Sequence, residues 1–284
     1  MGSRPLETAE ATVARIEAGA ARRLTPCGDG AMVWRSWGRG RPLVLLHGAS
    51  GSWTHWIRNV EALAARLRVL APDMPGFGDS DTAPPPATAE TLADIVSAGL
   101  DILLPPPVPI DLAGFSFGGI IAGLVAARQG ARVRTLALIG PNGMALPSRP
   151  TRPLVRIEPH MSLHETAAAH RENLRILMIA RSENADDLAV HVQMENVRRT
   201  RFKSGAIPAS DTLLRTLPAV KARLAGIWGG ADVFAVPYID ARRRALSAIQ
   251  HDLDFRVVPG AGHWVPYEAA EEVNRALLET LAGV

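Results

Sequence analysis

The stretch Gly114-Phe115-Ser116-Phe117-Gly118 decides how this chain of 284 residues is interpreted. A short apolar run at 108–113 precedes it and predicts a buried strand, and the run at 119–128 that follows is typical of a helix. A Gly-x-Ser-x-Gly motif between a strand and a helix is typical of a nucleophile elbow, where the serine occupies a strained turn. Side chains two residues away on either side would collide, which explains both glycines. The motif therefore predicts that the Ser116 hydroxyl is lifted above the end of a sheet.

Further apolar runs on both sides of this motif predict the fold class. A Gly-Asp-Gly turn between alternating segments at 23–37 suggests a hairpin, and helical patterns separate most of the later strands. Strands that are nearly all apolar and alternate with helices imply a parallel sheet covered on both faces. We therefore expect an α/β fold with a mostly parallel, doubly wound sheet and an inserted helical cap. The expected strands after the hairpin are 43–46, 69–73, 108–113, 133–139, 224–228 and 255–258.

One interval lacks any clear strand and sets the expected domain boundaries. About eighty residues separate the strands that end at Ile139 and begin at Leu224, which is too long for a loop. Helical patterns occupy 162–180 and 186–202, and Ser162 with Glu165 has the spacing of a capping box. We expect a helical N-terminal extension at 1–24, a core at 25–141 and 219–284, and a helical cap at 142–218.

Composition excludes several classes of function. The chain has 31 basic and 28 acidic residues and a net charge of +3, and its arginines are scattered, so no nucleic-acid footprint is expected. The single cysteine, Cys27, allows no intramolecular disulfide and favours a reducing compartment. No apolar run approaches the roughly 20 residues of a membrane span. We expect a cytoplasmic protein with no metal and no cofactor, and the oligomeric state stays open, a homodimer included.

The elbow makes chemical demands on the rest of the chain. A serine hydroxyl is a poor nucleophile until a base lies within hydrogen-bond reach and a carboxylate orients that base. Asp232 follows the strand at 224–228, and His263 follows the strand at 255–258. Parallel strands bring such residues to one edge of the sheet. The hypothesis is that Ser116 is the nucleophile, His263 the general base and then acid, and Asp232 the orienting carboxylate.

Donors for a negatively charged intermediate are expected at two places. One is the backbone N–H of Phe117, at the start of the helix after the elbow, where free amides and the helix dipole coincide. The other is the loop at 47–51, where Ala49 is the first choice and Ser50 the reserve. Asn142 also follows a strand where such folds can carry the acid, but an amide supplies no charge.

Aromatic residues gather near the expected site. Trp53 follows the loop at 47–51, Phe115 and Phe117 flank the serine, and Trp264 follows the histidine. An aromatic, apolar site under a helical cap favours a small or medium hydrophobic ester as the small-molecule substrate. The predicted substrate contacts are Ser50, Trp53, Phe115 and Trp264.

Over residues 25–284 the chain resembles the α/β-hydrolase family. The resemblance rests on these motifs: Leu46-His47-Gly48, Pro72 to Ser80, Gly114 to Gly119, Trp228 to Asp232, and Gly262-His263-Trp264. They are specific for the fold and not for a substrate. The resemblance includes carboxylesterases, lactonases, cofactor-free perhydrolases and meta-cleavage product hydrolases. Epoxide hydrolases and haloalkane dehalogenases carry an aspartate where this chain has Ser116, which argues against both.

The hydrolases that cut carbon–carbon bonds in ring-fission products need separate consideration. Gly262-His263-Trp264, followed by Glu268 and Asn274, is similar to them, as is the stretch at 172–178. Their elbow usually has Asn-Ser-Met where this chain has Phe115-Ser116-Phe117, and their glycine-rich loop differs from residues 49–52. The leading hypothesis is therefore ester hydrolysis through an acyl-enzyme. The alternatives are a carbon–carbon bond hydrolase and a non-catalytic ligand receptor on the same fold.

Overall fold

The computed structural model describes residues 7–148 and 151–283 of the chain. Residues 1–6 of the expected extension and 149–150 of the expected cap lie outside the described residues. Helix α1 (Ala9–Ala18) comes first, and the first strand begins at Ala21, so the helical extension ends before the expected boundary at residue 24. The strands are β1 (Ala21–Cys27), β2 (Gly30–Trp37), β3 (Pro42–Leu46), β4 (Arg68–Pro72), β5 (Ile110–Phe115), β6 (Val133–Ile139), β7 (Arg223–Gly229) and β8 (Asp254–Val258).

All eight strands form one sheet, in the order β1-β2-β4-β3-β5-β6-β7-β8. β1 pairs antiparallel with β2 and β2 antiparallel with β4, while every later pairing is parallel. In this register Leu46 lies opposite Gly114, and Ile139 lies opposite both Phe115 and Ile227. The carboxyl ends of β3, β5, β6 and β7 therefore share one edge, which confirms the predicted fold class.

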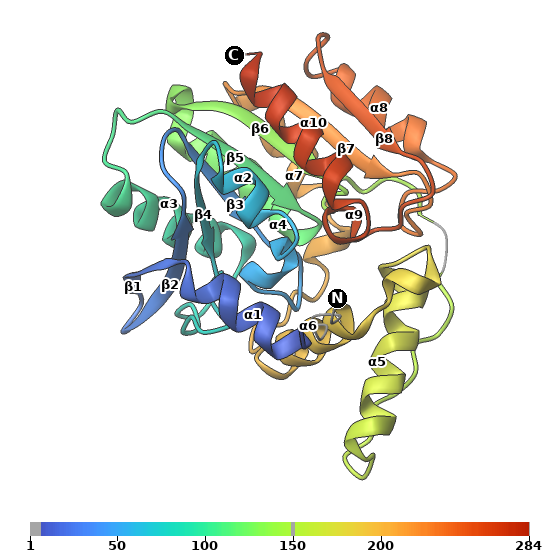
Figure 1. Cartoon of the computed structure of the whole chain (residues 1–284). Coiled ribbons are helices and arrows are strands. Elements are labelled where there is room, and N and C mark those ends of the chain that lie inside the picture. Colours follow the sequence, from blue (N-terminus) through green and yellow to red (C-terminus); the bar gives the residue numbers. More distant parts are fainter. Residues whose placement is uncertain (1–6, 149–150, 284) are drawn as a thin grey trace, which may run out of the picture.

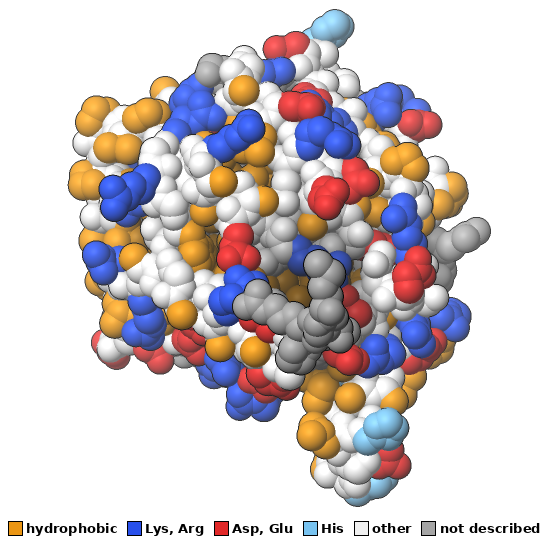
Figure 2. Space-filling model, viewed as in Figure 1, with side chains coloured by type: hydrophobic (Ala, Val, Ile, Leu, Met, Phe, Trp, Pro, Cys, Tyr) orange, Lys and Arg blue, Asp and Glu red, His pale blue; other side chains and the backbone are white. Residues whose placement is uncertain are grey.

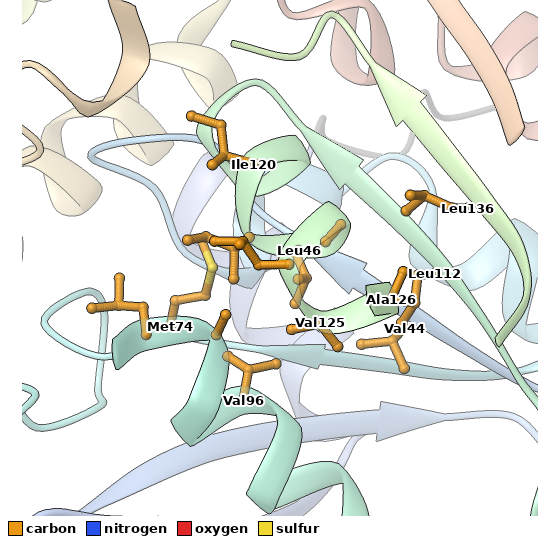
Figure 3. Close-up of a cluster of buried hydrophobic side chains, with 14 of the residues drawn as sticks. Val44, Leu46, Met74, Val96, Leu112, Ile120, Val125, Ala126 and Leu136 are labelled. Atoms are coloured by element: carbon orange, nitrogen blue, oxygen red, sulfur yellow. The ribbon is translucent and has the colours of Figure 1, made fainter. Parts of the chain in front are cut away.

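Helices cover both faces of the sheet (Figure 1). Alternate residues of β3 divide between two apolar clusters: Val44 and Leu46 belong to one, and Leu43 and Leu45 to the other. A strand buried on both faces reads as a continuous apolar run for this reason. Figure 3 shows the first cluster, in which side chains of the strands meet those of α3 and α4. The helices outside the 140–222 interval are α1, α2 (Val60–Ala64), α3 (Ala89–Leu103), α4 (Phe117–Gln129), α8 (Ile239–Ser247), α9 (Val265–Glu268) and α10 (Ala270–Ala282).

The segment between β6 and β7 contains α5 (Leu163–Leu177), α6 (Asp187–Arg198) and α7 (Thr212–Thr216). The predicted capping box of Ser162 and Glu165 starts α5. In Figure 1, α5 extends away from the sheet at the lower right, whereas α6 lies beside α1. Figure 2 shows hydrophobic and histidine side chains on this projection. Within the described part of the chain, no helix combines the length and apolar character needed to cross a membrane.

Candidate active site

Ser116 occupies the turn between β5 and α4. Its backbone has φ 53° and ψ −119°, in the left-handed half of conformational space that residues with a side chain rarely adopt. The chain on both sides is closely packed. A Cβ on Gly118 would lie 2.4 Å from the carbonyl oxygens of Leu46 and His47, and one on Gly114 would lie 2.4 Å from the Gly118 oxygen. Glycine is required at both positions because backbone fills the space that a side chain would need.

The three side chains selected from the sequence form one hydrogen-bonded chain. His263 Nε2 lies 2.9 Å from Ser116 Oγ, and His263 Nδ1 lies 2.9 Å from Asp232 Oδ2. The other carboxylate oxygen of Asp232 accepts a hydrogen bond of 2.9 Å from the Phe234 N–H. Ser116, His263 and Asp232 are 7%, 3% and 1% exposed, so little water competes for these contacts.

This geometry suits the transfer of a proton from serine to histidine. When Nδ1–H donates to the Asp232 carboxylate, Nε2 of His263 presents a lone pair to the Ser116 hydroxyl. The carboxylate also stabilises the imidazolium that forms when His263 takes the proton. The arrangement can therefore generate a serine nucleophile without a metal. Within the described residues, no cluster of three or more His, Cys, Asp or Glu side chains could hold a metal ion.

The expected oxyanion donors lie beside the elbow. Phe117 is the first residue of α4, where a backbone N–H has no partner within the helix and the helix dipole favours negative charge. Ala49 and Ser50 lie in the loop after β3 and are both half-buried, and Ser50 has a φ of 48°. A side-chain contact fixes this loop, because the Gly48 N–H donates to His55 Nδ1 at 3.1 Å. The donor roles of Phe117 and Ala49 stay predictions.

Two buried histidines support the same loop. The Met74 N–H donates to His47 Nε2 at 2.9 Å, so the proton of the neutral ring is on Nδ1, which lies 2.8 Å from the Gly48 oxygen. Burial lowers the pKa of His47, and it lowers the pKa of His55 well below its usual range. Both rings are therefore neutral at physiological pH. From the sequence, His47 was noted only as part of the motif Leu46-His47-Gly48, and the support that the two rings give to the loop was not predicted.

Two of the predicted substrate contacts are buried in the core, and their contact with a substrate stays a prediction. Phe115 and Trp264 expose no surface. Phe115 packs against the His263 ring, with centroids 5.1 Å apart, and Trp264 stacks on Tyr267 and donates from Nε1 to the His55 oxygen at 2.9 Å. These aromatic side chains point into the core and pack behind the hydrogen-bonded side chains of the site.

Trp53 and Ser50 have different surroundings. Trp53 is 3% exposed and borders a cavity of about 230 Å³ that is also lined by Arg35 and Asp73, with none of the triad residues in its wall. Asp73 accepts from the Trp53 N–H and forms an ion pair with the buried Arg35, both at 2.9 Å, which is a structural role. The cavity that Trp53 borders is therefore not the one that Asp232 lines, and the substrate-contact role of Trp53 stays a prediction. Ser50 stays a predicted substrate contact.

Two polar side chains at the site make contacts that sequence reasoning did not predict. Asn142, just after β6, accepts a hydrogen bond from Ser116 Oγ with its Oδ1 at 2.9 Å. The buried carboxylate of Glu268 accepts from three backbone N–H groups, those of Gly262, Ala180 and Arg181, at 2.6, 3.1 and 2.6 Å. Glu268 thus ties the loop that carries His263 to the segment after α5. A position after a strand pointed to Asn142, and the resemblance to the carbon–carbon bond hydrolases included Glu268, but neither signal predicted the contacts that these side chains make.

A cavity of about 390 Å³ lies next to the triad. Asn142 and Asp232 both contribute to its wall, and Phe234, which also packs edge-on against the His263 ring, lines it as well. Its other lining residues come mainly from the chain after β6, and they include Met144, Ala145, Leu146 and Pro208. Arg242 and Ser148 line it too, so its wall is mixed, and of the three hydrogen-bonded side chains only Asp232 borders it.

A doubly wound sheet with an elbow serine, a histidine and an aspartate at its carboxyl edge defines a class of hydrolytic enzymes. Residues 43–276 match the family model described as the alpha/beta hydrolase family, so the chain belongs to this family. The fold and the comparisons together show that it is an α/β-hydrolase enzyme.

Several characterised proteins are similar to the chain. It is 32% identical over 253 residues to the dihydrolipoyllysine-residue acetyltransferase component of the acetoin cleaving system of Pseudomonas putida, covering 85% of this chain but only 64% of that protein. It is 28% identical to 2-hydroxy-6-oxo-6-phenylhexa-2,4-dienoate hydrolase of Burkholderia cepacia, covering 86% of this chain and 89% of the relative. Carboxylesterase CesB of Bacillus subtilis superposes with a TM-score of 0.73 at 17% identity, over 97% and 96% of the two chains, which shows a shared fold.

Proposed function

We propose that this enzyme is a serine hydrolase that cleaves small or medium hydrophobic carboxylic esters through an acyl-enzyme. The observation that carries the proposal is the unbroken hydrogen-bonded chain from Ser116 through His263 to Asp232, with Ser116 on a strained elbow. Such a chain in a buried setting is what serine nucleophiles require. It also argues against the non-catalytic receptor, which needs no aligned base.

The reaction would run in two halves. The Ser116 hydroxyl proton passes to His263 Nε2 while Oγ bonds to the ester carbonyl carbon, and the carbonyl electron pair moves onto its oxygen. That oxyanion would be held by the N–H groups of Phe117 and Ala49. The tetrahedral intermediate then collapses, the alkoxide leaves and takes the proton from His263, and an acyl-serine remains. A water molecule repeats the sequence and releases the acid.

The proposed substrate class follows from the cavity beside the triad. Its volume of about 390 Å³ fits a small or medium group, and Met144, Leu146 and Phe234 make part of its wall apolar. The expected cap at 142–218 supplies part of that wall. The cap boundary, a cytoplasmic location and a homodimer stay predictions.

Carbon–carbon bond hydrolysis of a vinylogous diketone is the second candidate, and the comparisons favour it as much as ester hydrolysis. The named dienoate hydrolase of Burkholderia cepacia aligns over nearly the full length of both chains. The same serine, histidine and aspartate could serve such a substrate once its carbon skeleton is protonated and the ketone is exposed to attack. The two candidates differ in the bond cleaved and share the nucleophile.

The test combines a covalent probe, one variant and a substrate panel. A fluorophosphonate should label Ser116 in the folded enzyme, and Ser116→Ala should abolish labelling and lower turnover by about 10⁴-fold or more. Ser247→Ala, in the half-buried part of α8, is the matched control and should behave like the parent. Aryl esters of increasing acyl length and ring-fission dienoates then separate the two candidates. Ester turnover that survives Ser116→Ala would falsify the assignment of the nucleophile.

A further inference from the structure

The Ser116 hydroxyl lies between two hydrogen-bond partners. Its Oγ is 2.9 Å from His263 Nε2 and also 2.9 Å from Asn142 Oδ1. The Asn142 backbone N–H donates to the Ser116 carbonyl oxygen at 3.2 Å, which holds the residue against the elbow. The Asn142 side chain is half-buried and lines the 390 Å³ cavity. Asn142 therefore touches the atom that would attack the substrate.

Counting protons shows why this contact matters. A hydroxyl has one proton, and here it faces two acceptors. If Ser116 donates to Asn142 Oδ1, the Ser116–His263 contact needs a proton on Nε2. The Nδ1 atom, 2.9 Å from the Asp232 carboxylate, also holds a proton, so the ring is then an imidazolium. In that state His263 has no lone pair to offer, and the nucleophile is idle.

The reactive state needs the opposite arrangement. The Ser116 proton must then point to His263 Nε2, which leaves only lone pairs of Oγ facing Asn142. An amide oxygen at 2.9 Å from those lone pairs would repel them, whereas a half-turn about the Cβ–Cγ bond of Asn142 brings its Nδ2–H to the same place as a donor.

We propose that Asn142 is a further catalytic residue, whose Nδ2–H donates to Ser116 Oγ in the reactive state and so directs the single hydroxyl proton to His263. This inference rests on the serine hydrolase function proposed above. During attack the proton passes from Oγ to Nε2, the bond from Oγ to the carbonyl carbon forms, and Asn142 keeps both of its amide protons. With its oxygen turned inward, the same side chain holds the serine proton away from the base.

The position of Asn142 shows that it does not stand in for Asp232 as the residue that orients His263. A carboxylate that orients the base must reach His263 Nδ1, and Asp232 Oδ2 already occupies that position at 2.9 Å. Asn142 lies on the serine side of the ring, at Oγ. An aspartate at position 142 would be a permanent acceptor for the serine proton and could not replace Asp232.

The test measures the rate of fluorophosphonate labelling and of aryl ester turnover between pH 5 and pH 9. N142D preserves the shape of the side chain but cannot donate when ionised, so both rates should fall by about 100-fold at neutral pH. The deficit should shrink as the pH falls, because a protonated carboxyl can donate to Oγ. N142A removes both orientations and should cost about tenfold at every pH.

Controls and contrary outcomes keep the proposal falsifiable. Asn173→Asp makes the same chemical change in α5 and also loses a hydrogen bond, here from Nδ2 to the Val155 oxygen, so it should lower the thermal unfolding midpoint slightly but leave both rates at the parental value. Three outcomes would each overturn the proposed role of Asn142. N142D could be labelled at the parental rate, its loss of rate could be independent of pH, or the addition of N142D could restore activity to D232N. If N142D does not fold, N142A becomes the test, and a parental rate in N142A would overturn the proposed role. Failure of the parent itself to label at Ser116 would instead reject the serine hydrolase function, and the role of Asn142 with it.

Discussion

The sheet edge that carries Ser116, His263 and Asp232, called the catalytic edge after the proposed function, and helix α5 differ in how firmly they are held. At the catalytic edge the side chains of Ser116, His263 and Asp232 are each engaged by at least one neighbour. Helix α5 extends from the body of the molecule, and Leu163 at its start is 77% exposed. Helix α6 is intermediate, because Asn196 accepts from the Ser52 and Thr54 hydroxyls. The periodicity of the sequence predicted both helices, α5 and α6. It did not indicate which of the two is held against the rest of the protein by side-chain contacts.

Glu268 is where the two regions meet. Its carboxylate holds Gly262, one residue before His263, together with Ala180 and Arg181 just beyond α5. The Trp264 N–H adds a second tie by donating to the Met178 oxygen at 2.7 Å. The residues that follow the C-terminal end of α5 are thus fixed to the loop that carries His263, whereas the N-terminal start of the helix is exposed. Substitutions in the two regions should therefore have effects of very different kinds and sizes.

The largest effect should come from Asp232→Asn at the catalytic edge. The amide keeps the shape but cannot stabilise the imidazolium and favours the wrong tautomer of His263, so turnover should fall about 10³- to 10⁴-fold. The unfolding midpoint should change little. Steady-state kinetics with an aryl ester provide the measurement, and a loss below tenfold would contradict the orienting role of Asp232.

Glu268→Gln should give the largest loss of stability. The neutral side chain accepts more weakly from three backbone N–H groups and turns its own amide protons toward some of them, at a cost of about 2–3 kcal/mol in the free energy of unfolding. Urea unfolding followed by fluorescence measures this. Glu272→Gln, on the exposed side of α10, is the matched control and should lie within about 0.5 kcal/mol of the parent. Equal stability of the two variants would show that Glu268 does not join the regions.

The smallest effects should separate α6 from α5. Asn196→Ala removes the acceptor for two buried hydroxyls and should cost about 1–2 kcal/mol. Leu163→Ser, at an exposed position, should change the free energy of unfolding by less than about 0.5 kcal/mol. Both are measured by thermal and urea unfolding. A larger loss for Leu163→Ser than for Asn196→Ala would reverse the comparison and indicate that the exposed face of α5 is covered in solution.

Much of the fold could be predicted because its signals are local. Each strand is an apolar run, and the elbow glycines report a steric requirement that the structure locates at the carbonyls of Leu46 and His47. Asp232 and His263 could be selected because serine chemistry demands an acid and a base at later strand ends. The structure brings these side chains within hydrogen-bond distance, and their catalytic roles await the Ser116→Ala and Asp232→Asn experiments.

The remaining features depend on neighbours that are distant in the sequence. Phe115 and Trp264 were expected in a pocket because they adjoin catalytic residues, yet adjacency along the chain does not fix the direction of a side chain, and both are in the core. Asn142 was dismissed for lacking charge, although its contact is with the serine oxygen and not with the histidine. The contacts of Glu268 could not be predicted, because its three backbone partners come from two other segments of the chain.

The hydrogen bond between Ser116 and His263 has a consequence for how the chain folds. It joins residues that are 147 positions apart, and the bond between Arg41 and the Leu281 oxygen joins residues 240 apart. Contacts of such high sequence separation form slowly, because the entropy of closing long loops must be overcome first. No short fragment contains the whole site, so activity should return during refolding only after segments from distant parts of the chain have assembled. The enzyme's own turnover is then a reporter of complete folding.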